Sequence, residues 1–325
     1  MKTFTLILTV SLSLVAAPAF AADSDPLLDR ASRYFEALPA SMPGAENDTA
    51  EKIALGKKLF FDTRLSINDT QSCASCHRLE NGLPGVDNLP VSPGAEGKLG
   101  TRNSPTVLNA GLQRRQFWDG RASDLVEQAK GPILNPIEMG MPDEQTVEKK
   151  LQAIAEYRDA FAAVFAGTEQ PLSYQHIAEA IAAFERTLLT ESRFDDFLKG
   201  DGSALNAAER QGLATFIKLD CTSCHDGVLV GGELFEKLGK ENPYENQVDG
   251  GVYEVSKDEA DRMVFKVAPL RNVALTAPYF HDGKIATLPE AVRTMAKLHL
   301  DKELSDQEVQ DVVSFLQALT DKARE

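Results

Sequence analysis

The four cysteines of this chain fall in two copies of one short pattern, Cys-x-x-Cys-His. The first copy contains Cys73, Cys76 and His77, and the second, 148 residues later, contains Cys221, Cys224 and His225. Two thiols at this spacing can add to the two vinyl groups of one porphyrin, and the histidine that follows can bind the haem iron. The sequence therefore predicts two covalently bound c-type haems, with His77 and His225 as proximal iron ligands.

Other uses of four cysteines fit this sequence less well. A zinc site needs four ligands, and only His176, His281 and His299 remain to be shared between the two motifs. A thioredoxin-like motif needs no following histidine and lies in a βαβ context, which the sequence lacks. Two disulfides would be the first expectation for an exported chain, but the repeated histidine argues for haem.

The ligand on the far side of each iron decides what the haem does. A methionine closes the iron and suits electron transfer, whereas a vacant position lets peroxide bind. In the second half, Met295 lies 70 residues after His225 and is a candidate sixth ligand. Core packing is the alternative for a lone methionine, and His299, one helical turn further on, is a rival ligand.

The first half has no histidine between His77 and His176, so Met139 and Met141 are the nearby candidate ligands there. Beside them, Glu138 is a lone carboxylate in the apolar, proline-flanked stretch NPIEMGMP. A carboxylate in such a place could move protons on a bound peroxide. The same pattern also fits a solvated surface glutamate.

The segments that must position these motifs are repeated as well. FWDGRASDL in the first half returns as FHDGKIATL in the second, with Trp118 replaced by His281. Upstream of each haem motif lies a G-x-x-x-F pattern, at Gly56 and at Gly212. A helical glycine costs about 1 kcal/mol relative to alanine, so its repetition indicates close approach of the helix backbone to another helix or to the porphyrin. We expect a mainly α protein built from two cytochrome c-like haem domains related by duplication.

The rest of the chain is mostly helical by pattern. Apolar residues recur at helical spacing at Ile177, Ile181, Phe184 and Leu188. Capping boxes predict two helix starts, and they are formed by Asn206 with Glu209 and by Ser305 with Glu308. Stretches rich in proline and glycine at 81–106 and 131–142 predict long ordered loops. The stretch 190–203 marks the boundary, so the haem domains are expected at 23–190 and 191–325.

The first 22 residues read as a signal peptide. They have Lys2 near the start, an apolar stretch too short for a bilayer and an Ala19-Phe20-Ala21 cleavage site. A membrane anchor is the alternative, but no other run is long enough to span a membrane. We therefore expect a periplasmic protein. Its net charge of −15, about −16 without Lys2, argues against nucleic acid and permits a basic protein partner.

From about residue 26 to 322 the sequence resembles the bacterial di-haem cytochrome c peroxidases. The resemblance rests on motifs in both halves, namely LGKKLFFDTRLS, CASCH, RNSPTV, QFWDGRA, EQAKGPI, CTSCH and APLRNVALTAPYFHDG. It implies a low-potential N-terminal haem that reduces hydrogen peroxide to water. It also implies a high-potential C-terminal haem that accepts electrons from a small c-type cytochrome or cupredoxin, and a homodimer, as is frequent in the family.

Carried over position by position, the resemblance implies roles for further residues. His77, His225 and Met295 would bind the haem irons, Gln128 and Glu138 would act on the peroxide, and Trp118 would relay electrons between the haems. An interhaem calcium ion would be bound by Asn103, Thr276 and Pro278, largely through backbone carbonyls, since calcium favours oxygen ligands.

One departure from the family concerns the loop after the first haem motif. Many members have a histidine there that blocks the peroxidatic iron until the other haem is reduced, but this chain has Ala95. We therefore expect the first haem to be open in the fully oxidised protein.

Two other functions are also compatible with the sequence. One is a di-haem electron carrier without catalysis. The other is a di-haem oxidase acting on a protein substrate, like the relative that matures tryptophan tryptophylquinone with a tyrosine where this chain has Met295.

Overall fold

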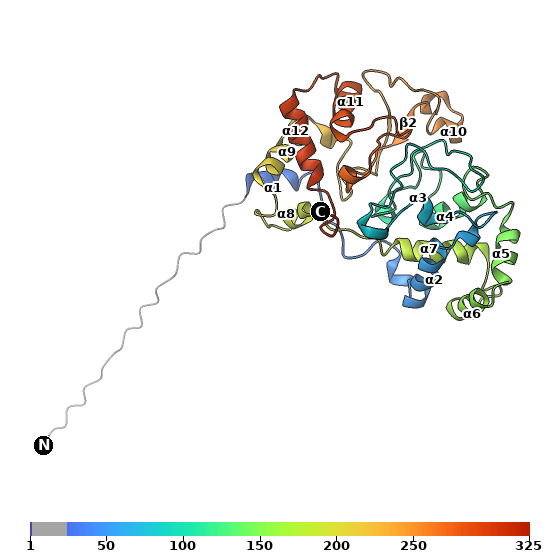
Figure 1. Cartoon of the computed structure of the whole chain (residues 1–325). Coiled ribbons are helices and arrows are strands. Elements are labelled where there is room, and N and C mark those ends of the chain that lie inside the picture. The colour runs from blue at the N-terminus through green and yellow to red at the C-terminus, as the bar shows by residue number, and fades with distance from the viewer. Residues whose placement is uncertain (2–24) are drawn as a thin grey trace.

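The computed structural model describes Met1 and residues 25–325 of the chain, and the predicted signal peptide lies outside the described residues. The described part is mainly helical, with a single antiparallel pair of short strands in register at Glu236 and Phe265. Figure 1 shows two groups of helices, α2 to α7 in one and α1, α8, α9, α11 and α12 in the other. The predicted fold class is confirmed.

The elements follow one another with long connections between them. The α-helices are α1 (Pro26–Ala31), α2 (Ala50–Phe60), α3 (Cys73–Cys76), α4 (Leu125–Leu134), α5 (Glu144–Gln152), α6 (Ala155–Val164), α7 (Tyr174–Glu185), α8 (Arg193–Leu198), α9 (Ala207–Lys218), α10 (Tyr253–Ser256), α11 (Leu288–Leu300) and α12 (Asp306–Gln317). The strands are β1 (Phe235–Lys237) and β2 (Val264–Lys266). Short 3-10 turns include η5 (Cys221–Ser223) and η7 (Val273–Leu275).

The N-terminal core forms where α2 crosses α7. Gly56 of α2 lies so close to α7 that an added Cβ atom would overlap the carbonyl oxygen of Ala180. Four residues further on, the ring of Phe60 packs edge-on against Phe184, with 5.2 Å between the ring centroids. The repeated glycine predicted this close approach.

The C-terminal core repeats the same crossing with α9 and α12. An added Cβ atom on Gly212 would overlap the carbonyl oxygen of Asp311, and the rings of Phe216 and Phe315 lie 5.2 Å apart. Asn206 and Ser305 start these two helices with the predicted capping boxes. In each half, the helix that precedes the haem motif crosses a later helix in the same way, which is the structural mark of the duplication.

The segment 26–35 packs in the second core, although its sequence position placed it with the expected domain 23–190. The ring of Phe35 contacts Phe194 at 5.3 Å, Phe315 at 6.2 Å and Phe216 at 6.4 Å between centroids. Burial of this aromatic ring among three others outweighs its distance along the chain. The division near residue 190 stays our interpretation for the rest of the chain.

Helix α4 also differs from expectation, because it runs through Gly131 and Pro132 into the stretch predicted as a loop. Proline lacks the N–H that would bond the carbonyl of Gln128 one turn earlier, so it weakens the last turn without ending it. The irregular segment then continues from Asn135 to Met141.

A buried threonine joins the two halves. The side-chain amides of Asn109 and Asn272, which are equivalent in the two copies, both donate to the hydroxyl oxygen of Thr190, at 2.8 and 3.0 Å. Both asparagines have positive φ values of 60° and 63°. Equivalent residues that meet at one atom indicate a local two-fold relation between the copies. Within residues 25–325, no helix is long and apolar enough to cross a bilayer.

Candidate active site

The C-terminal haem motif opens into a cavity with about 1330 Å³ of empty space. Its wall includes Cys221, Cys224 and His225 of the haem motif and Met295 and His299 of α11. The structure thus brings the expected ligands of the second haem around one space. The backbone N–H of Gly239 donates to Nε2 of His299 at 3.5 Å, so one nitrogen of the rival ligand already has a partner.

Both motif histidines are held in the same way. Nδ1 of His77 lies 3.3 Å from the carbonyl oxygen of Gly85, and Nδ1 of His225 lies 3.3 Å from that of Val230. A ring that donates through Nδ1 has Nε2 free to bind a metal. Burial lowers the pKa of both rings, that of His225 to about 4, which favours the neutral form that binds iron.

His281 provides a test of whether the cavity fits a haem. Its side chain is only 2% exposed, its ring stacks on Phe265 at 4.2 Å, and it lines the cavity. Among the described residues, its Nε2 has no hydrogen-bond partner. Buried polar atoms are rarely left without a partner, and each haem has two carboxylates that could supply one. The residues present therefore fit a haem.

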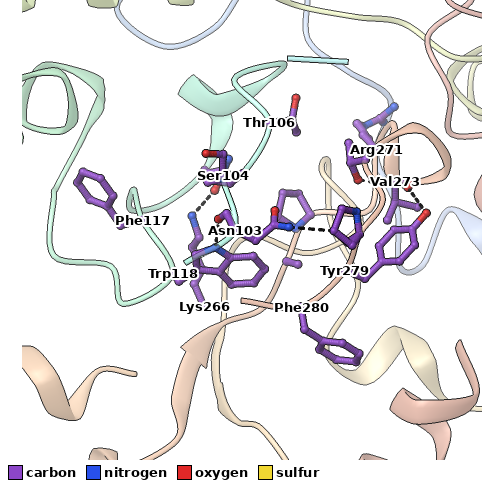
Figure 2. A pocket seen from close by; sticks show the side chains of 16 residues that line it. Asn103, Ser104, Thr106, Phe117, Trp118, Lys266, Arg271, Val273, Tyr279 and Phe280 are labelled. Atoms are coloured by element: carbon purple, nitrogen blue, oxygen red, sulfur yellow. Dashed lines mark hydrogen bonds between the residues drawn. The ribbon is translucent and has the colours of Figure 1, made fainter. Parts of the chain in front are cut away.

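A second cavity, with about 680 Å³ of empty space, lies between the two halves (Figure 2). Trp118 lines both cavities and is held at two points. Its Nε1 donates to the carbonyl oxygen of Asn103 at 2.9 Å, and its own carbonyl accepts from the N–H of Lys266 at 2.8 Å. The indole packs edge-on against His281 with 6.5 Å between centroids. Trp118 and His281, which occupy equivalent positions in the two copies of the repeat, thus contact each other between the two halves.

The three residues expected to bind calcium, Asn103, Thr276 and Pro278, line this second cavity together. The amide of Asn103 donates to the carbonyl oxygen of Pro278 at 3.1 Å. Because the nitrogen and oxygen of an amide exchange places when it flips, the same position can present an oxygen to a cation. Within residues 25–325, no group of three or more His, Cys, Asp or Glu side chains could hold a metal. A calcium ion here would depend on amide and carbonyl oxygens, which this position provides.

Lys266 is a buried cation that the sequence analysis missed. It is 5% exposed, lines both cavities and donates to the side-chain oxygen of Gln113 and to the carbonyl oxygen of Arg115. Burial lowers its pKa to about 7. The flanking apolar residues in VFKVA were the available signal, because a nearly continuous apolar run is typical of a buried strand. Its position on the wall of the C-terminal haem cavity would allow its ammonium group to pair with a carboxylate of a bound haem.

Glu138 lies in the N-terminal half, in the irregular segment that follows α4. It is partly buried, and its Oε1 accepts from the amide of Asn135 at 3.0 Å. Burial raises the pKa of the carboxyl, while the charge of Arg121 opposes the shift. A carboxyl with a raised pKa is suited to proton transfer. Gln128 lies on α4, the helix that leads into this segment.

The loop containing Ala95 packs directly on the Glu138 segment. The N–H of Ala95 donates to the carbonyl oxygen of Glu138 at 2.7 Å, and the amide of Asn68 donates to the carbonyl oxygen of Ala95. The backbone of Ala95 is therefore bonded to that of Glu138, and its methyl side chain has no atom that binds iron. Met139 and Met141 are each 4% exposed and belong to the apolar core.

Comparison with known proteins agrees with this arrangement. The sequence model of the family described as di-haem cytochrome c peroxidase matches residues 50–203. The cytochrome c551 peroxidase of Pseudomonas aeruginosa is 44% identical over 308 residues, which cover 93% of this chain and 88% of that protein. The cytochrome c551 peroxidase of Nitrosomonas europaea is 46% identical over 275 residues, 84% of this chain and 81% of that protein.

A solved structure of a MauG-like protein associated with microbial copper homeostasis has the same fold. Its TM-score is 0.77 at 30% sequence identity, with 89% of this chain and 95% of that chain covered. The chain therefore belongs to the bacterial di-haem cytochrome c peroxidase family, as the resemblance predicted. The predictions of a peroxidase enzyme and of two haem groups are confirmed.

Proposed function

We propose that this protein is a periplasmic cytochrome c peroxidase that reduces hydrogen peroxide to water. Electrons would come singly from a small c-type cytochrome or cupredoxin, and the negative net charge of the chain suits a basic donor. The observation that carries the proposal is the difference between the two halves. Met295 lines the C-terminal haem cavity together with the haem motif, whereas in the first half the backbones of Ala95 and Glu138 are hydrogen-bonded to each other.

The haems would be attached through thioether bonds to the four motif cysteines, with His77 and His225 as proximal ligands. Met295 would close the C-terminal iron and make that haem the site that accepts electrons. The bound haems supply the redox chemistry and the iron to which peroxide binds. Trp118, held between the two cavities, would lie on the electron route. Calcium bound at Asn103, Thr276 and Pro278 would stabilise the interface between the halves.

Glu138 would transfer the proton. Its carboxylate would take the proton from the nearer oxygen of the peroxide and return it to the farther oxygen as the O–O bond breaks. Gln128 would orient the peroxide through its amide. Two electrons from the donor and two protons from water convert one peroxide into two water molecules. With alanine at position 95, we expect the oxidised enzyme to react without prior reduction.

Stopped-flow mixing of the fully oxidised protein with hydrogen peroxide tests the proposal. We expect the haem absorption bands to change at once, without pre-reduction. A low-spin, six-coordinate spectrum from both haems and no reaction in any redox state would identify an electron carrier instead. Failure to oxidise any donor protein, with retained reactivity toward peroxide, would favour the oxidase alternative.

The role of Glu138 is tested by Glu138→Gln, which we expect to lower turnover by about two to four orders of magnitude, the usual effect of losing a general acid–base group. Glu127→Gln is the matched control, because Glu127 lies on α4 and pairs with Lys130 at the surface, at 2.6 Å. Unchanged turnover in Glu138→Gln would remove Glu138 from the mechanism.

A further inference from the structure

A buried carboxyl at the end of α7 has no part in the mechanism above. Glu185 is 4% exposed, and among the described residues its Oε2 has no hydrogen-bond partner. The adjacent Arg186 is bound by Asp48 through two bonds of 2.6 and 3.0 Å, and Lys52 also pairs with Asp48 at 3.1 Å. A buried carboxylate without a paired cation is costly. Burial raises the pKa of Glu185 to about 8.

The duplication indicates what Glu185 faces. Gly56 contacts Ala180 and Phe184 on α7 as Gly212 contacts Asp311 and Phe315 on α12. The residue after each phenylalanine is therefore equivalent, which pairs Glu185 with Leu316. Leu316 lines the C-terminal haem cavity. By this correspondence, Glu185 would face the N-terminal haem at the position where the other half has a leucine.

An independent observation supports this position. Burial is the main cause that raises the pKa of the Cys73 thiol, and repulsion by Glu185 is the next largest. Such an interaction requires the carboxyl to lie near the cysteine that attaches the first haem. Glu185 is thus close to the cysteine through which the first haem would be attached.

We propose that Glu185 binds a proton when the N-terminal haem is reduced and releases it when that haem is oxidised. The inference rests on the haem attachment at Cys73 that the proposed function includes. The carboxylate gains one proton from solvent as the haem gains one electron, so the net charge of the buried site does not change. The electron comes from the donor protein in the enzyme and from dithionite in the test below. In a medium of low dielectric constant, this compensation favours the coupled reaction.

The other charged groups around α7 already have partners. The half-buried charged side chains on α2, α4 and α5 pair as follows: Lys52 with Asp48, Lys58 with Glu156, Lys130 with Glu127, and Lys150 with Asp69. Glu148 of α5 accepts from the N–H of Tyr174 at 2.7 Å. On α7 itself, Nδ1 of His176 lies 2.8 Å from the carbonyl oxygen of Pro171. The carboxylate of Glu179 accepts a hydrogen bond from the side-chain amide of Gln175 at the surface. Apart from Glu138, which the proposed function assigns to the peroxide, Glu185 is therefore the buried carboxyl that we expect to respond to the charge of the first haem.

The test measures the midpoint potential of the N-terminal haem against pH, by optical redox titration of the haem-loaded protein with dithionite. In the wild type, we expect the potential to fall as pH rises. The limiting slope for one proton per electron is about 59 mV for each tenfold change in proton concentration. In Glu185→Gln the potential should lose this slope and stay near the low-pH value of the wild type, because the neutral amide mimics the protonated acid.

Glu179→Gln is the matched control, since it removes a carboxyl from the solvent-exposed side of the same helix, and it should keep the wild-type slope. Equal slopes in the wild type and Glu185→Gln would overturn the proposal. If Glu185→Gln does not fold, infrared difference spectra of the wild type decide the question. Reduction should produce the band of a newly protonated buried carboxyl, and a spectrum without that band would refute the idea. Neither measurement uses peroxide, so failure of the peroxidase proposal would be seen separately.

Discussion

Replacing Gly56 with alanine tests the helix crossing on which the N-terminal haem site is built. An added Cβ atom would lie 2.5 Å from the carbonyl carbon of Ala180, whereas carbon atoms pack best at about 3.5–4.0 Å. The carbonyl oxygen of Ala180 would lie closer still, so α2 and α7 would have to separate by at least about 1 Å. A gap of this size loses about a quarter to a half of the dispersion energy of the atoms across it.

Overpacking of this kind costs about 1–3 kcal/mol, and the upper part of the range applies because both clashing atoms belong to the backbone. Alanine recovers about 1 kcal/mol through its helix propensity. We therefore expect Gly56→Ala to lower the free energy of unfolding by about 2 kcal/mol. Gly212→Ala should cost less, because its Cβ atom would lie 3.0 Å from the equivalent carbonyl carbon.

Urea unfolding of the haem-loaded protein, followed by far-UV circular dichroism, measures these changes. Ala54→Gly is the control, because Ala54 is exposed on the same helix and its replacement should cost only the propensity term, about 1 kcal/mol. If Gly56→Ala is as stable as the wild type or more stable, propensity governs this position and the close crossing is refuted. A larger loss in Gly212→Ala than in Gly56→Ala would contradict the distances.

Three further predictions follow from buried polar groups. Burial raises the pKa of Glu138, and the carboxyl must be ionised to act as a base, so kcat/KM for peroxide should fall with decreasing pH at a midpoint above 4.5. A midpoint below that value in a pH–rate profile would refute the raised pKa. Thr190→Val should lower the free energy of unfolding in urea by at least about 2 kcal/mol, since two buried amides lose their acceptor. Thr190→Ser keeps the hydroxyl and should therefore retain most of the wild-type stability. Arg271→Met should lower the free energy of unfolding by about 3–5 kcal/mol, because it leaves the buried carboxylate of Asp195 without a paired cation. A thermal unfolding curve that matches the wild type would contradict this.

Local sequence patterns were enough to predict several features of the chain. The two copies of the cysteine–histidine motif predicted the number of haem groups, because the residues expected to attach one haem and bind its iron are neighbours in the sequence. The capping boxes at Asn206 and Ser305 gave two helix starts, since they are satisfied within three residues. The repeated glycines predicted the two close helix crossings. Alanine at position 95 gave the expectation of an open iron, because it has no atom that binds metal.

Other features depend on residues that are far apart in the chain. Phe35 packs in the second core, the amides of both halves meet at Thr190, and Trp118 contacts His281. Hydrophobic periodicity describes only neighbours along one helix, so no local pattern contained these contacts. The same holds for Glu185, which the sequence presents as one more charge after an apolar stripe. Its burial near Cys73 was decided by the packing of α7 on α2, because a side chain's solvent exposure depends on what other segments cover it.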